Sequence, residues 1–203
     1  MRIRIYKYIC TLVIISVFAG CSSYNTKRGT QLSTRTPGID IPIVSFTPVP
    51  DKVKRYAGSR KWNFVVIHHS ASNSGNAASF GKQHREINGW SRGLGYDFVI
   101  GNGHGSDDGQ IEVGPRWVKQ IDGAHAGVKK YNRFGIGICL VGNFDNTRPT
   151  KKQMSSLISL IKFFQERYNI PSENVILHKH VKTTACPGSH FPYFEILSNI
   201  HAR

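Results

Sequence analysis

One amphipathic segment, residues 150–169, constrains the fold most because an apolar run lies on either side of it. Its apolar side chains recur at helical spacing: Met154, Leu157, Ile158, Ile161 and Phe164. Thr150 followed by Gln153 is a capping-box pattern, so we expect the helix to begin there. The flanking runs 136–141 and 174–178 are short and apolar, which predicts buried strands. The order strand, helix, strand favours an α/β domain whose sheet is covered on at least one face.

Shorter segments continue the same alternation on both sides of this unit. We predict further strands at 62–67 and 96–100, and further helices at 77–88 and 191–200; residues 101–109 are expected to form a hairpin or loop that leads into 111–113. The glycine-rich stretch 101–109 does not lead from a strand into a helix, which excludes a nucleotide-binding phosphate loop. The alternation predicts a single α/β domain at residues 61–203.

The N-terminus has the pattern of an export signal at residues 1–20. A basic start precedes an apolar centre that is too short to span a bilayer comfortably. Phe-Ala-Gly-Cys, ending at Cys21, resembles a bacterial lipobox, although Phe18 stands where such motifs usually carry Leu. We therefore expect a diacylated Cys21 that anchors the exported chain to a membrane facing the periplasm; Ser22 favours the outer membrane. An ordinary secretory leader or an uncleaved anchor is the alternative.

Residues 21–60 are rich in Ser, Thr, Pro and Lys and show no sustained periodicity. This composition predicts a tether between the lipid anchor and the domain. The basic run 52–55 is interpreted as part of a solvated linker rather than as a contact with anionic lipid.

The chain is strongly basic, with 27 Lys and Arg against 12 Asp and Glu and a net charge of +15. Such a surface attracts polyanions, or serves only solubility. The basic residues are spread out and no familiar nucleic-acid-binding signature is present, so we expect no nucleic-acid partner.

Four cysteines are present, and two of them, Cys10 and Cys21, belong to the leader and its processing site. Cys139 lies in the apolar run 136–141, where a free thiol packs as a small hydrophobe. This usage excludes a disulfide framework, although a bridge from Cys139 to Cys186 stays open.

His178 and Cys186 flank a turn that Pro187 and Gly188 close. An imidazole and a thiolate together suit a first-row metal, most of all zinc. A third ligand is needed, and His68, at the end of a predicted strand, is the candidate; its neighbour His69 points the other way if the strand continues. Three protein ligands leave one tetrahedral position open, which is typical of a catalytic zinc and predicts a hydrolase. A lone histidine at a strand end is more often structural.

Five segments in this order resemble the zinc-dependent N-acetylmuramoyl-L-alanine amidases of the type-2 amidase and peptidoglycan-recognition-protein family. The segments are Ile67-His68-His69-Ser70, Gly95-Tyr96-Asp97-Phe98, Gly123-Ala-His-Ala-Gly127, residues 135–143 and residues 178–188. The resemblance covers about residues 60–200 and includes the amidase-type phage lysozymes.

The resemblance implies a central mixed sheet flanked by helices, and one Zn²⁺ held by His68, His178 and Cys186. It also implies catalytic roles for Tyr96 and Thr184, which would donate hydrogen bonds to the developing oxyanion or position the water. His125 and Asn143 are further candidates, as residues that line the substrate groove; a structural role is the alternative for both. The expected partner is peptidoglycan or muropeptides, and the expected state is a monomer.

Two positions depart from relatives. Cys139 stands where intracellular recycling amidases often carry a glutamate, which favours the tyrosine-using branch. His180 stands where relatives often carry an aspartate. If that aspartate orients a metal ligand, this chain lacks the same support, and His180 is itself a candidate that competes for the metal. The other functional interpretation is a peptidoglycan-binding module that does not cut, but such relatives typically lack the cysteine ligand.

Overall fold

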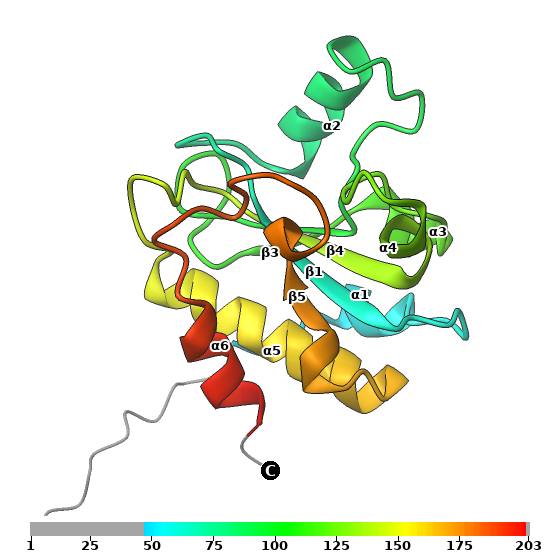
Figure 1. The fold of residues 1–203 in the computed structure, drawn as a ribbon. Helices are drawn as coiled ribbons and strands as arrows, with labels where there is room; N and C mark the ends of the chain where they lie inside the picture. The colour runs from blue at the N-terminus through cyan, green and yellow to red at the C-terminus, as the bar shows by residue number, and fades with distance from the viewer. Residues whose placement is uncertain (1–46, 202–203) are drawn as a thin grey trace, which may run out of the picture. The chain divides into compact units, whose positions relative to one another are not determined.

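A five-stranded mixed sheet lies at the centre of residues 47–201, the part of the chain that the computed structural model describes (Figure 1). The strand order is β3-β2-β4-β1-β5. The strands are β1 (Phe64–His69), β2 (Phe98–Ile100), β3 (Ile111–Val113), β4 (Gly135–Leu140) and β5 (Val175–Leu177). All neighbouring strands pair in parallel except β3, which runs antiparallel to β2. The predicted single α/β domain with a mixed sheet is confirmed.

The register of the sheet brings the predicted site residues to one edge. His68 pairs with Cys139 across β1 and β4, and β5 ends at Leu177, directly before His178. Because parallel strands share the direction of their carboxyl ends, the ends of β1, β4 and β5 meet there. In open α/β sheets this edge is where ligands usually bind.

Helices cover both faces of the sheet. They are α1 (Asp51–Arg55), α2 (Ala77–Glu86), α3 (Pro115–Lys119), α4 (Lys129–Phe134), α5 (Lys151–Tyr168) and α6 (Tyr193–Ile200), with two 3-10 turns, η1 (Ser172–Asn174) and η2 (His178–His180). In Figure 1, α5 and α6 lie on one side of the sheet and α2 on the other. The three longest helices were predicted; α1, α3 and α4 were not.

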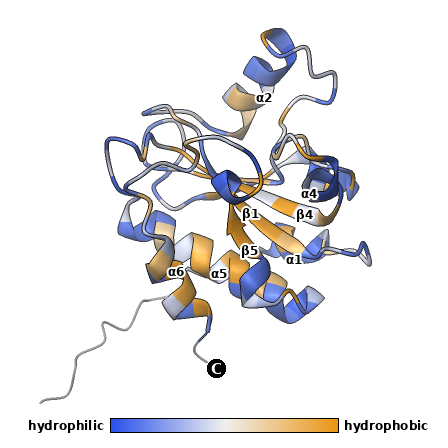
Figure 2. Ribbon diagram, in the orientation of Figure 1, coloured by the Kyte–Doolittle hydropathy of each residue, from blue (hydrophilic) through white to orange (hydrophobic). Residues whose placement is uncertain are grey.

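The amphipathic helix α5 supports one face as predicted. Its capping box forms: the Gln153 backbone N–H donates to Thr150 Oγ1 at 3.0 Å, and the Thr150 N–H donates to Gln153 Oε1 at 3.1 Å. Its inner side chains join the apolar side chains of all five strands in one large core, and Figure 2 shows the apolar strands and the apolar side of α5. On this face the odd-numbered residues of β1, Val65 and Ile67, point into the core.

The alternate residues of the strands face α2 and form a different surface. They include Val66 and His68 of β1 and Gly137 and Cys139 of β4. The apolar cluster here is small and consists of Phe80, Leu94, Val99, Cys139 and Val141. This face leaves room for polar side chains.

The segment just before the predicted boundary at residue 61 is folded onto the domain. Val53 of α1 is fully buried, and its carbonyl accepts a hydrogen bond from Trp117 Nε1 at 3.0 Å. Thr47 N–H donates to Ser155 Oγ at 3.0 Å, and Arg60 pairs with Asp122. The interpretation of residues 47–60 as a solvated tether is therefore wrong, because distant partners bind this segment. The export signal, Cys21 and the tether up to residue 46 lie outside the described residues.

Among the helices of residues 47–201, none has both the length and the apolar character needed to cross a membrane.

Candidate metal centre

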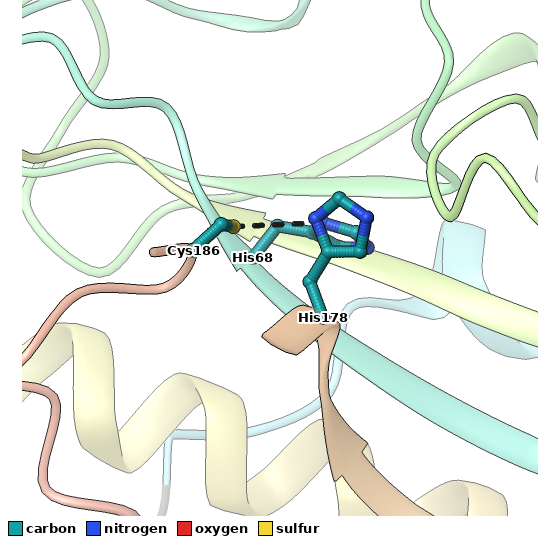
Figure 3. Close-up of side chains that lie close together, drawn as sticks. All are labelled: His68, His178 and Cys186. Carbon is teal, nitrogen blue, oxygen red and sulfur yellow. Dashed lines mark hydrogen bonds between the residues drawn. The ribbon is translucent and has the colours of Figure 1, made fainter. Parts of the chain in front are cut away.

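The three predicted metal ligands converge in the structure (Figure 3). His68 comes from the end of β1, His178 from the start of η2, and Cys186 from the loop that precedes α6. One ligand atom from each lies within 4.8 Å of the others, and His68 Nδ1 is 3.8 Å from Cys186 Sγ. Ligand atoms around a tetrahedral zinc are about 3.3 to 3.8 Å apart, so this donor set fits the ion.

Hydrogen bonds determine which ring nitrogen each histidine presents. His178 Nε2 lies 3.3 Å from the carbonyl oxygen of Ala126, which can only accept, so Nε2 carries the proton and Nδ1 keeps its lone pair. His68 Nε2 lies 3.1 Å from His125 Nδ1, which leaves His68 Nδ1 to face Cys186. Burial lowers the pKa of His178, and lowers that of His68 well below its ordinary value. Both imidazoles are therefore neutral at pH 7, the form that binds a metal.

Cys186 is held as a thiol by its surroundings. Burial raises its pKa to about 12, while the backbone N–H of His69, 3.4 Å from Sγ, acts in the opposite direction. A bound cation deprotonates a coordinating thiol, so the loss of this proton is coupled to metal binding.

His125 lies directly behind His68, where the prediction of a groove residue did not place it. Its side chain is buried and contacts His68 through Nδ1, and its Nε2 lies 3.3 Å from the carbonyl oxygen of Gly135. Burial lowers its pKa to about 3. The sequence held one signal for this position, the glycines at 123 and 137 that make room for the ring.

Tyr96 lies beside the candidate ligands, with its ring centroid 5.2 Å from that of His68. Burial, together with the neighbouring thiols of Cys139 and Cys186, raises its pKa well above the ordinary value. The phenol is therefore a hydrogen-bond donor at neutral pH. Thr184 is also near, and its hydroxyl accepts the backbone N–H of Cys186 at 3.3 Å.

A model of the type-2 amidases, described as N-acetylmuramoyl-L-alanine amidase, matches residues 58–189. The chain belongs to this family. One peptidoglycan-recognition protein of Drosophila melanogaster is 36% identical over 100 residues, 49% of this chain and 50% of its own, so the chain spans about half the length of that relative. A second such protein of the same fly is 32% identical over 136 residues, 63% of this chain and 68% of its own.

Two solved structures show the same architecture as this type-2 amidase family member. The N-acetylmuramoyl-L-alanine amidase LysC from Clostridium intestinale superposes with a TM-score of 0.60 at 33% identity, over 77% of this chain and 92% of that one. A mutant of Drosophila PGRP-LB in complex with tracheal cytotoxin gives a TM-score of 0.57 at 29% identity, over 69% of this chain and 82% of that one.

Two further histidines of this family member point away from the three converging side chains. His69 Nδ1 accepts the backbone N–H of Phe144 at 3.1 Å, in keeping with its predicted orientation. His180 Nδ1 accepts the Leu177 N–H at 3.3 Å, and its ring packs edge-on against Tyr193. His180 therefore stabilises the turn of η2, and the interpretation of it as a competing ligand is wrong.

Asn143 lies apart from the three converging side chains and stabilises the turn after β4. Its Oδ1 accepts the Asp145 N–H at 3.1 Å, and its carbonyl accepts the Thr147 N–H at 3.1 Å. It also lines a pocket of about 250 Å³ with Asn102 and Arg148. The structure thus gives Asn143 a local structural role beside an open pocket.

The two cysteines of the described residues are both free. Cys139 is fully buried on β4 next to Tyr96, as its apolar setting predicted, and no bridge to Cys186 forms.

Proposed function

We propose that the protein is a zinc-dependent N-acetylmuramoyl-L-alanine amidase, which hydrolyses the amide between N-acetylmuramic acid and L-alanine in peptidoglycan. The observation that carries the proposal is the convergence of His68, His178 and Cys186, whose candidate ligand atoms lie within 4.8 Å of one another. Two neutral imidazoles and a thiol that loses its proton on binding suit one zinc ion and leave a fourth position for the reaction.

When bound, zinc activates a water molecule near neutral pH and polarises the amide carbonyl. Side chains of the protein supply the hydrogen bonds to the reacting amide. Tyr96 keeps its proton and donates a hydrogen bond where negative charge develops on the carbonyl oxygen. Thr184, two residues before Cys186, is the second donor. The products are a free lactyl carboxylate on muramic acid and a peptide with a free L-alanine amine.

Both classes of relative support a peptidoglycan substrate. The LysC structure is named as an amidase, and the PGRP-LB structure holds tracheal cytotoxin. The second candidate is a recognition module that binds muropeptides without cutting them, because the curated relatives are named as recognition proteins. The presence of Cys186 favours the enzyme, since it completes the set of three ligands.

The deciding experiment is mass spectrometry of muropeptides incubated with the protein, with zinc or with a chelator. The amidase releases an intact stem peptide with a free N-terminal L-alanine, and only when zinc is present. Cys186→Ala serves as the inactive control. Muropeptides that stay uncut but bind in a calorimetric titration would establish the recognition module instead.

We further propose that the protein is exported and anchored through lipidated Cys21 to the periplasmic side of the envelope, with the outer membrane favoured, where it remodels or recycles the wall. The net charge, +15 for the whole sequence and +12 without Arg2, Arg4 and Lys7 of the export signal, suits a wall that carries peptide carboxylates. Partition of the chain into a detergent phase tests the anchor. Cys21→Ala should move the protein to the aqueous phase, and partition that does not change would exclude lipidation at this residue.

A further inference from the structure

His125 connects a candidate metal ligand to the backbone of the sheet. It lies 57 positions along the chain from His68, yet the two rings meet at 3.1 Å. On its other side His125 Nε2 faces the carbonyl oxygen of Gly135 at 3.3 Å. A carbonyl oxygen only accepts, so the proton of a neutral His125 is on Nε2 and its Nδ1 is an acceptor. His68 Nε2 must then donate to it, so His68 Nδ1, which faces Cys186, carries no proton.

The ring of His125 occupies a slot that two glycines create. A Cβ atom on Gly137 would lie 2.5 Å from His125 Cδ2, and one on Gly123 would lie 2.4 Å from the same atom. Neither glycine has a positive φ, so the backbone conformation does not require glycine at either position. The absence of a side chain there is explained by the space that the His125 ring needs.

The loop that carries His125 also orients the second histidine. The carbonyl of Ala126 accepts from His178 Nε2 at 3.3 Å. Asn132 Oδ1 holds the loop in place, since it accepts the backbone N–H groups of His125 and Ala126 at 3.0 and 2.8 Å. The loop at residues 123–127 therefore accepts a hydrogen bond from Nε2 of both candidate ligands, which leaves Nδ1 of each imidazole free to bind a metal.

We propose that His125 is a positioning residue that, from its slot between Gly123 and Gly137, fixes His68 in the tautomer that binds the metal through Nδ1. The inference rests on the proposed zinc site, and it assigns His125 a role behind the ligand instead of in the substrate groove. Partners behind metal ligands typically change metal affinity by 10- to 100-fold when they are removed.

Three variants of the full chain separate the hydrogen bond from the volume of the ring. His125→Phe fills the slot but cannot accept from His68, and we expect its zinc affinity to fall about 10- to 100-fold. His125→Asn places an amide oxygen near the position of Nδ1, and we expect it to recover most of the affinity. Gly137→Ala leaves His125 in the sequence but pushes its ring out of the slot, and should also weaken zinc binding. Gly81→Ala is the matched control, because a Cβ there meets its nearest atom at 3.5 Å.

Competition with a chromophoric chelator measures zinc affinity without any substrate, and denaturant unfolding of the zinc-free variants measures stability. A purely structural role for His125 would lower stability in His125→Phe and leave zinc affinity unchanged, which would overturn the inference. Equal affinity in His125→Phe and His125→Asn would also overturn it. If muropeptides stay uncut while His125→Phe still weakens zinc binding, the amidase proposal fails and this inference stands.

Discussion

The two faces of the sheet are built from different chemistry although they share the same strands. The face toward α5 and α6 carries aliphatic and aromatic side chains that pack into one large core. The face toward α2 carries His68, Cys139 and Gly137, and its apolar cluster has five members. Alternation along β1 and β4 sends successive residues to opposite faces, so one strand serves both purposes.

The difference indicates that one face of the sheet mainly stabilises the fold and that the other carries the candidate site. Burial of apolar area on the α5 side stabilises the fold. The other side buries ionisable groups. Burial disfavours their charged forms, so the pKa values of His68 and His125 are lowered and that of Cys186 is raised. Such clusters of shifted groups are typical of functional sites. Variants of the two faces should therefore fail in different ways.

The largest effect is expected for Cys186→Ala on the site face. Loss of one of three ligands should weaken zinc binding by at least about 10³-fold and abolish amidase activity, with little loss of stability in the zinc-free protein. Chelator competition and muropeptide turnover measure the two effects. Cys139→Ala, the other free cysteine, should keep its zinc affinity; a similar loss in both variants would contradict the ligand assignment.

Leu157→Ala tests the opposite face. Leu157 is fully buried in α5, and its truncation should lower the free energy of unfolding by about 2 to 5 kcal/mol through lost burial and a cavity. Denaturant unfolding measures this, and zinc affinity should not change. Phe194→Ala is the control, because that side chain is 81% exposed and should change stability by less than about 0.5 kcal/mol.

Replacing tyrosine with phenylalanine removes one hydroxyl, and this change can be made on each face of the sheet. Tyr96→Phe removes the proposed donor and should lower kcat about 10²-fold without changing zinc affinity. Tyr193→Phe on α6 removes a hydrogen bond of 2.6 Å to the Val175 carbonyl and should cost about 1 kcal/mol of stability without changing kcat. Equal kcat values in the two variants would remove Tyr96 from the mechanism.

Asp97→Asn tests a buried polar group directly before β2. Burial raises the pKa of Asp97 to about 7, although its Oδ2 accepts the Gly137 N–H at 2.8 Å. The folded state therefore favours the protonated carboxyl, and the stability it gives is lost as pH rises from about 4 through about 7. Asparagine resembles the protonated form, so the variant should be more stable than the parent by up to about 4 kcal/mol at pH 8 and by little at pH 4. Unfolding curves with the same pH dependence in both proteins would contradict this.

Proton release on zinc binding gives the smallest effect. The histidines are neutral and the thiol of Cys186 is protonated at pH 7, so binding should release about one proton and affinity should rise about tenfold per pH unit from pH 7 to 9. Calorimetry in buffers of different ionisation enthalpy counts the protons. Binding without proton release would show that the thiol does not coordinate.

Long periodic segments were predictable from the sequence, because their signals are local. The capping box and apolar stripe of α5 gave its bounds to within one residue, and the strand ending near His68 was found from its apolar run. The short helices α1, α3 and α4 have five or six residues and no complete apolar stripe, so distant contacts determine them. Val53 is buried in the large core, and its carbonyl accepts a hydrogen bond from Trp117, which lies 64 positions further along the chain.

The candidate ligands were predictable, and the residue behind them was not. His178 and Cys186 are eight residues apart in a turn, and His68 ends a recognisable strand. The contact of His125 with His68 depends on the pairing of β1 with β4 and on the slot at Gly137, which no local pattern encodes. The turn role of His180 likewise depends on the packing of Tyr193.

X-ray absorption at the zinc edge of the loaded full chain tests the central assignment most directly. The account predicts one sulfur ligand at about 2.3 Å with nitrogen and oxygen ligands at about 2.0 to 2.1 Å, and loss of the sulfur signal in Cys186→Ala. A zinc environment without sulfur in the unmodified protein would contradict the assignment of His68, His178 and Cys186 as the metal site.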